Sequence, residues 1–140
     1  MHIALIMDGN RRWARREGYP DLKGHRAGAD TLRTLVRVSP DLGVKVLTVF
    51  AFSLENWKRS ALEIHGLFAL LEKNIAVYSQ KLKENHVQLR IIGDLSTLPT
   101  SLQQTIKDHD YVCDAPKMTL QVALNYGGRQ DIVQAAQSLA

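Results

Sequence analysis

Four short apolar runs, each ending in a polar turn, constrain the fold of this chain more than any other feature. The runs are rich in β-branched and aromatic residues, as buried strands are, and they span residues 3–7, 44–52, 87–92 and 118–124. Segments with helical apolar spacing occupy residues 25–42, 61–85, 98–108 and 129–140, and Gly43 is expected to cap the first of them. Strands that alternate with helices predict an α/β fold with a mostly parallel sheet flanked by helices.

Length and composition fit one domain spanning residues 1–140, with enough apolar residues to build a core without disulfides. The single cysteine, Cys113, cannot form an internal disulfide, which favours a reducing, cytoplasmic setting. The formal net charge of +4 indicates an anionic partner but does not choose among nucleic acid, lipid headgroup and diphosphate. A solvated basic surface explains the charge equally well.

The loop after the first apolar run combines a carboxylate, a glycine, an amide and two guanidiniums. Asp8 is a candidate Mg²⁺ ligand, Gly9 lets the backbone approach an anion, and Arg12 can hold phosphate oxygens. On the residues alone, an ordinary Asp-Gly turn beside a basic surface patch explains the loop at least as well.

The loop after the second run also gathers polar groups that could bind an anion. Its candidate residues are Ser53, Leu54, Glu55, Asn56, Trp57 and Arg59. The alternative is the start of a helix, with Ser53 as N-cap and Asn56 and Trp57 as packing residues.

Two further segments carry glycine and polar residues next to predicted helices. Residues 24–28 are expected to open a helix, where free backbone N–H groups favour anions, although a lone histidine such as His25 is more often a cap or core residue. Residues 125–129 read as a tight turn that requires glycine more than as a binding loop. Because ligands bind beyond the carboxyl ends of parallel strands, the loops at Asp8, Ser53 and Asn125 are expected to line one crevice.

Several common catalytic motifs are missing from the sequence. There is no GxxxxGK[ST] phosphate-binding loop, no GxGxxG fingerprint and no GxSxG nucleophile turn. An aspartate-rich DDxxD pair is also absent, which disfavours a trans-type prenyl-chain synthase.

Five motifs in order resemble the cis-prenyltransferase family, and within it the undecaprenyl diphosphate synthases. They read MDGNRRWA at residues 7–14, GHRAG at 24–28, FSLENWKR at 52–59, LRIIGD at 89–94 and NYGGR at 125–129. The resemblance covers essentially the whole chain. It implies a parallel sheet flanked by helices around a hydrophobic tunnel, with the Leu and Phe68 face of residues 61–85 as a tunnel wall.

The resemblance also implies the reaction and the site. Isopentenyl diphosphate would be condensed onto farnesyl diphosphate, with Mg²⁺ as cofactor, to make a polyprenyl diphosphate lipid carrier. Asp8 would bind the metal and Asn56 would be the proton acceptor. The substrate-binding set would be Gly9, Asn10, Arg11, Arg12, Trp13, His25, Ser53, Leu54, Glu55, Trp57 and Arg59. The family further implies a homodimer of the complete protein, located in the cytoplasm with peripheral contact to the membrane that receives the lipid.

The sequence departs from the family pattern in two places. Asp21 stands where the family usually has an arginine on the diphosphate, and it should repel this ligand unless Lys23 or Arg26 compensates. The family's later R-x(5)-R-x-S segment, which grips isopentenyl diphosphate, is not present, so the isolated chain is expected to be poorly active.

Two other function classes remain open on the sequence. A non-catalytic subunit or relic that binds a prenyl diphosphate would fit the shortened pattern, but such partners tend to lose the carboxylate and arginines that Asp8 and Arg12 represent here. A nucleic-acid binder would need basic residues interleaved with exposed aromatics along one face. The two tryptophans sit in the polar loops instead, so no nucleic-acid partner is expected.

Overall fold

The computed structural model describes residues 1–139, which form a four-stranded sheet with its connecting helices. The elements in chain order are β1 (His2–Ile6), α1 (Asn10–Arg16), α2 (Asp21–Val38), β2 (Val46–Ser53), the short 3₁₀ helix η1 (Leu54–Lys58), α3 (Ala61–Glu84), β3 (Val87–Ile92), α4 (Thr100–Asp108), β4 (Met118–Tyr126) and α5 (Gly128–Ser138). The expected α/β class is confirmed.

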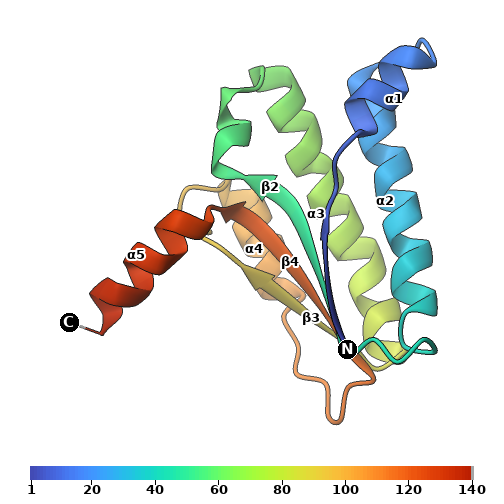
Figure 1. Ribbon diagram of the computed structural model, residues 1–140, viewed down its shortest axis with the longest axis vertical. Helices are drawn as coiled ribbons and strands as arrows, with labels where there is room; N and C mark the ends of the chain where they lie inside the picture. The colour runs from blue at the N-terminus through green and yellow to red at the C-terminus, as the bar shows by residue number, and fades with distance from the viewer. Residues whose placement is uncertain (140) are drawn as a thin grey trace.

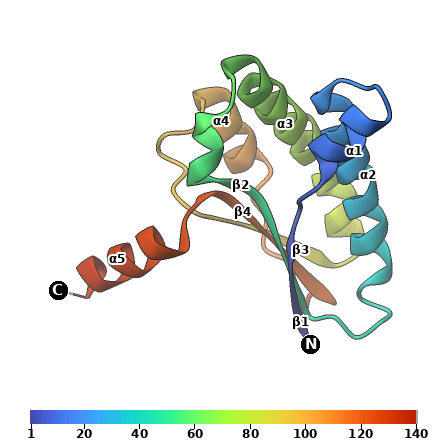
Figure 2. The same cartoon turned by 45° about the horizontal axis from the view of Figure 1, so that its top comes forward.

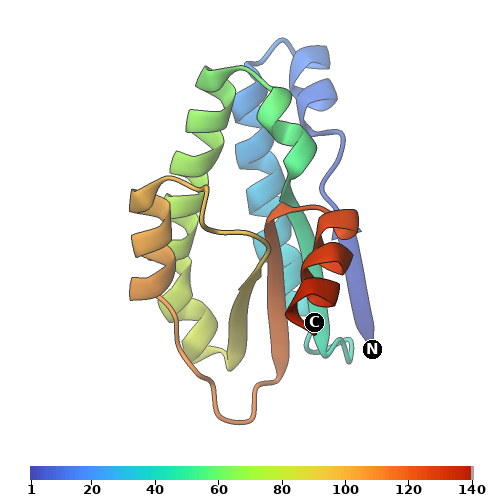
Figure 3. The same ribbon diagram turned by 90° about the vertical axis from the view of Figure 1, so that its left-hand side faces the viewer.

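All the strand pairings in the sheet are parallel, and the strand order is β1-β2-β4-β3. Helices α2 and α3 lie side by side over one face, and α4 packs beside α3 (Figure 1). Figure 3, in which the left-hand side of Figure 1 faces the viewer, shows α5 in front of the sheet and α2 and α3 behind it. The carboxyl ends of β1 and β2 therefore open next to the first turns of α2 and α3.

The hydrophobic core lies between the sheet and helices α2, α3 and α4. Val49, Phe52 and Leu124 on the central strands are almost completely buried, and Leu102 of α4 closes the core from the side. Burying side chains of this size stabilises the fold by roughly 1.5–3 kcal/mol each. The β-branched and aromatic residues that marked these strands in the sequence thus have a packing role.

Helix α2 differs from the prediction at both ends. It begins at Asp21, directly after Pro20, and ends at Val38 rather than at residue 42. Pro20 fixes an extended backbone that suits the residue before a helix, and the turn around Pro40 stops the helix before Gly43. Gly43 has a positive φ of 78° in that turn, so its predicted role as the helix cap is wrong.

The other boundaries differ less from the prediction. The charged segment after Asp8 is helix α1, and the loop after β2 contains η1. Helix α4 starts two residues later than expected because Pro99 precedes its first turn. Strand β4 continues to Tyr126, two residues beyond its apolar run, because it still pairs with β2 there.

Helix α5 projects away from the sheet, and its residues are exposed on every side (Figure 2). Its apolar side chains Ile132 and Val133 face solvent. Within residues 1–139, no helix is long and apolar enough to cross a membrane.

Candidate functional site

A cavity of about 810 Å³ lies between the sheet and helices α2 and α3. Most of its wall consists of aliphatic and aromatic side chains. Near the carboxyl ends of β1 and β2, however, polar side chains line it: Asp8, Asn10, His25, Ser53, Asn56 and Arg59. Ligands of parallel α/β sheets bind at this edge, so the polar end of the cavity is the candidate site.

Asp8 follows β1 directly and presents its carboxylate at the mouth of the cavity. Its Oδ1 accepts a hydrogen bond from the Gly9 backbone N–H at 2.6 Å, and its Oδ2 pairs with Arg12 Nη2 at 2.9 Å. Gly9 has φ 92°, a left-handed conformation that a residue without a Cβ adopts at little cost. Both charged side chains are largely exposed, so they are free to exchange this ion pair for a ligand.

Asn10 is held by two glycines of α2, which explains the spacing of the GHRAG motif. A Cβ on Gly24 would lie 2.1 Å from the backbone oxygen of Asn10, and one on Gly28 would lie 2.5 Å from its Nδ2. The two glycines sit inside α2, so the prediction that residues 24–28 open a helix is wrong. Their role is to let α1 approach α2 closely enough to place Asn10 in the cavity wall.

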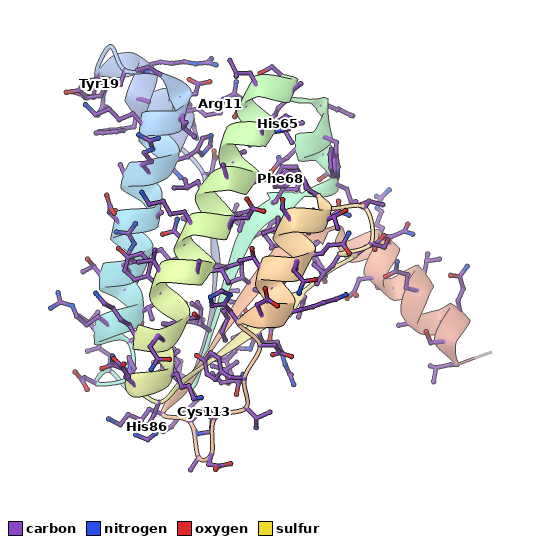
Figure 4. The ribbon with its side chains drawn as sticks, turned by 180° about the vertical axis from the view of Figure 1, so that it is seen from behind. Arg11, Tyr19, His65, Phe68, His86 and Cys113 are labelled. Carbon is purple, nitrogen blue, oxygen red and sulfur yellow. The ribbon has the colours of Figure 1, made fainter. Side chains whose placement is uncertain are left out.

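Three cationic or potentially cationic groups converge on Glu63 in the first turn of α3. Its Oε1 lies 3.2 Å from His25 Nε2, 3.1 Å from Arg59 Nη1 and 3.4 Å from Arg11 Nε. Figure 4 shows Arg11 in the gap between α1 and the start of α3. Burial lowers the pKa of His25 below its usual value, while the hydrogen bond and charge of Glu63 oppose this shift. The cluster joins α1, α2 and α3 behind the polar end of the cavity.

The loop after β2 is the start of a short helix, as the packing alternative proposed, and it also borders the cavity. The side-chain oxygen of Asn56 accepts a hydrogen bond from the Ser53 backbone N–H at 3.2 Å, which fixes the amide of Asn56 against the end of β2. A hydrogen bond with Ser53 lowers the pKa of Glu55, which stays on the exposed side. Ser53 and Asn56 therefore face the cavity and Glu55 does not.

Trp57 is fixed by Asn125 at the end of β4. Its indole Nε1–H donates to Asn125 Oδ1 at 2.7 Å, and the Asn125 Nδ2 donates to the Asp94 backbone oxygen and to Thr97 Oγ1 at 2.7 and 2.8 Å. Asn125 is buried, with a positive φ of 49° that asparagine tolerates better than most residues. The expected third loop of the crevice is thus a buried hydrogen-bonded support for Trp57, which we call the Asn125 brace. The prediction that Asn125 lines the crevice is wrong.

Asp21 engages the arginines of α1 rather than standing unpaired. It accepts hydrogen bonds from Arg15 Nε and Nη2 at 2.8 and 2.7 Å and from Arg11 Nε at 3.0 Å. The hydrogen bond from Arg15 is the main reason that the pKa of Asp21 lies well below its usual range. Lys23 is one of the two cations, with Arg26, that could compensate the carboxylate, and its ammonium lies 3.2 Å above the Tyr19 ring.

One face of α3 forms part of the apolar wall of the cavity, together with residues of α2 and of the sheet. The apolar and aromatic residues of α3 that line it are Leu67, Leu70, Leu71, Ile75, Tyr78 and Leu82, as the helical spacing predicts, and three polar residues of the helix line the cavity with them: Asn74, Ser79 and Lys81. Leu62 belongs to the same spacing but is exposed, because it lies in the first turn beyond the sheet. Phe68 points elsewhere: its ring packs 5.0 Å from Phe52 and 5.6 Å from Trp57, so it supports η1 instead of lining the cavity.

Part of the predicted substrate-binding set therefore lies at the cavity and part lies behind it. Gly9, Arg11, Arg12, Trp13, Leu54, Glu55 and Trp57 are not in the cavity wall. Sequence reasoning missed Glu63 and Arg15. The only local signal for Glu63 is its position three residues after Ser60, which indicates a helix cap, and the Glu63 N–H does donate to Ser60 Oγ.

The fold and this site define a class: a parallel α/β protein whose apolar cavity ends in cations and amides, suited to a ligand with an anionic head and an apolar body. A family model described as putative undecaprenyl diphosphate synthase matches residues 6–140. The chain belongs to this family, the cis-prenyltransferases.

Similar proteins agree with that assignment. A ditrans,polycis-undecaprenyl-diphosphate synthase ((2E,6E)-farnesyl-diphosphate specific) of Pseudomonas putida is 45% identical over 140 residues, covering 99% of this chain and 56% of that protein. An isoprenyl transferase of Bacillus subtilis is 44% identical over 143 residues, and the match covers 99% of this chain and 54% of that protein. The chain thus spans about half the length of the curated relatives it matches.

Solved structures show the same fold. Lavandulyl diphosphate synthase from Lavandula x intermedia, in complex with dimethylallyl diphosphate, matches with a TM-score of 0.92 and 35% identity over 99% of this chain and 60% of that one. A probable undecaprenyl diphosphate synthase from Campylobacter jejuni matches with a TM-score of 0.78 and 34% identity, again over 99% and 60%.

Proposed function

We propose that this chain carries the allylic half-site of a cis-prenyl chain-elongating transferase, which condenses isopentenyl diphosphate onto farnesyl diphosphate to make a polyprenyl diphosphate. The observation that carries the proposal is the cavity between the sheet, α2 and α3, which joins an apolar body to a group of polar side chains at the carboxyl ends of β1 and β2. The relative from Pseudomonas putida is named for farnesyl diphosphate, and the Lavandula structure contains dimethylallyl diphosphate. Both names support an allylic diphosphate as the ligand.

The diphosphate would lie at the polar end of the cavity, next to His25, Arg59 and the backbone of Gly9. When the bond between the allylic carbon and the diphosphate breaks, negative charge develops on the diphosphate oxygens. Hydrogen-bond donors fixed in position to face that charge lower the activation barrier of this step. Arg12, which pairs with Asp8 in this structure, would be a further donor to the diphosphate once it is bound. Asn56, fixed against Ser53, is the candidate proton acceptor.

Asp8 would hold Mg²⁺ together with the diphosphate. Within residues 1–139 no group of three or more His, Cys, Asp or Glu could hold a metal by itself. A single carboxylate nevertheless fits Mg²⁺, which is commonly bound by one or two carboxylates plus substrate phosphates and water. When bound, the ion would neutralise charge on the diphosphate.

The apolar part of the cavity would hold the growing prenyl chain as a hydrophobic tunnel between the sheet, α2 and α3. Excluding water from this wall would protect the reacting allylic centre. Homodimerisation of the whole protein, a cytoplasmic location and peripheral delivery of the lipid to a membrane belong to the same proposal. A non-catalytic subunit is not favoured, because Asp8 and Arg12 are in place and the named relatives are enzymes.

The direct test is calorimetric titration of farnesyl diphosphate with Mg²⁺ into the 140-residue chain and into Asp8→Asn. We expect the variant to bind at least about tenfold more weakly, because it loses the charge that would hold the metal. Asp114→Asn, which makes the same change in an exposed loop, is the matched control and should bind like the unmodified chain. Equal binding by the chain and Asp8→Asn, or none by a folded chain, would contradict the proposal.

A further inference from the structure

Glu63 is a mostly buried carboxylate that does not itself line the cavity. Its side chain is 10% exposed, whereas its partners His25 and Arg59 both line the polar end. A buried carboxylate is costly unless charged or hydrogen-bonded partners compensate it, and here three partners share one oxygen. Glu63 therefore stands behind the groups that face the ligand.

The chemistry of the cluster also fixes the state of the imidazole. An ionised carboxylate can only accept hydrogen bonds, so the Nε2 of His25, 3.2 Å from Glu63, must carry a proton. A histidine whose one nitrogen donates to a carboxylate is held in one tautomer and one ring orientation. Arg59 is oriented in the same way, because its Nη1 donates to the same Oε1 at 3.1 Å.

We propose that Glu63 is a positioning residue, which fixes the His25 ring and the Arg59 guanidinium at the polar end of the cavity so that they face a diphosphate. The inference rests on the proposed function for the identity of the ligand. The geometry of the cluster stands independently of that identity.

A simple count of charges predicts that loss of Glu63 strengthens diphosphate binding, whereas the positioning role predicts that it weakens binding. Removing the Glu63 carboxylate would make the end of the cavity more positive, and this alone should strengthen the binding of an anion. The positioning role instead requires binding to weaken, because His25 and Arg59 would lose the group that orients them. The sign of the change in affinity therefore separates the two explanations.

The experiment compares Glu63→Gln and Glu63→Asp with the unmodified chain by calorimetric titration of farnesyl diphosphate with Mg²⁺. We expect Glu63→Gln to bind roughly tenfold more weakly or worse, and Glu63→Asp, which keeps the charge on a shorter side chain, to recover part of the loss. Glu84→Gln, at the exposed end of the same helix, is the matched control. Urea denaturation of each variant checks that it is folded. If Glu63→Gln does not fold, the comparison is made with Glu63→Asp alone.

A second readout is the pKa of His25, measured by NMR titration without ligand and assigned with His25→Gln. The groups that face His25 are Glu63 of α3, which raises its pKa, and Arg59 and Arg11, which lower it together with burial. Removing the carboxylate should therefore lower the pKa of His25 further, and Glu84→Gln should leave it unchanged.

These results have distinct meanings. An unchanged pKa of His25 in Glu63→Gln would overturn the positioning role, whatever the ligand. Equal or tighter binding by a folded Glu63→Gln would overturn it for the diphosphate. If the unmodified chain binds no diphosphate but the pKa of His25 still falls in Glu63→Gln, the proposed function fails while the positioning role stands.

Discussion

Two arginines of α1 converge on the carboxylate of Asp21 and are held away from the mouth of the cavity. Arg15 forms two hydrogen bonds with it, and Arg11 is shared between Asp21 and Glu63. A diphosphate that needs these guanidiniums has to compete with a carboxylate already in place. At the scale of single residues, Asp21 should act as a built-in competitor of the anionic ligand.

Asp21→Asn should accordingly bind farnesyl diphosphate with Mg²⁺ about two- to fivefold more tightly, as expected for releasing partly exposed ion pairs. The pKa of Asp21 lies well below its usual range, so the carboxylate is ionised and this effect should hold throughout the neutral pH range. Glu17→Gln, which removes the carboxylate that pairs with Arg16, is the control and should change affinity little. Weaker binding by Asp21→Asn would show that the contact orders α1 for the ligand instead of competing with it.

At the scale of elements, the contact between α1 and α2 depends on the absence of a side chain at Gly24. In an ordinary helix interior, Gly→Ala stabilises by about 1 kcal/mol. In α2 the added Cβ would meet the backbone of Asn10, which can move only if the whole of α1 moves.

We therefore expect Gly24→Ala to lower the free energy of unfolding by about 1–3 kcal/mol, the cost of overpacking, and to weaken diphosphate binding because Asn10 is displaced. Urea denaturation measures the first effect and calorimetry the second. Gly128→Ala, in the first turn of α5 where a Cβ meets nothing within 4 Å, should be neutral or stabilising. A stable Gly24→Ala with unchanged binding would show that α1 adjusts freely.

The strands and the long helices could be predicted because their periodic apolar residues pack directly on one another. The start of α2 could not, since Pro20 and the contact with α1 set it rather than apolar spacing. Glu63 was missed for a similar reason: its partner His25 is 38 residues away, and only the fold brings the two together. Asp8 and Ser53 were expected to line the crevice and do line the cavity, because they lie at the carboxyl ends of β1 and β2.

At the scale of the whole molecule, Asn125 joins three segments that are distant in sequence. Its amide connects the end of β4 with η1 through Trp57 and with the segment after β3 through Asp94 and Thr97. The site loop is thereby tied to the sheet at a point outside the cavity. Loosening this point should affect Asn56, the neighbour of Trp57, without touching the ligand.

Asn125→Ala should lower the free energy of unfolding by about 2–4 kcal/mol, since buried partners are left without hydrogen bonds and alanine is strained at a positive φ. The indole N–H signal of Trp57 should also exchange faster with solvent in NMR spectra. Asn125→Gly separates the two causes, because glycine accepts the backbone conformation: it should be less destabilised but lose the same protection. Full protection of the Trp57 signal in either variant would rule out the Asn125 brace.

The strand order β1-β2-β4-β3 has a consequence for how the chain is made. Strand β4, which lies between β2 and β3 in the sheet, is the last of the four to leave the ribosome, so β3 has no partner in the sheet until residues 118–123 have been synthesised. At a synthesis rate of roughly 5–20 residues per second, the apolar side chains of β2, α3 and β3 then wait for seconds without their central layer. During that interval the apolar surface that β4 will cover stays exposed, and the cavity cannot close around any ligand before β4 contributes its part of the wall.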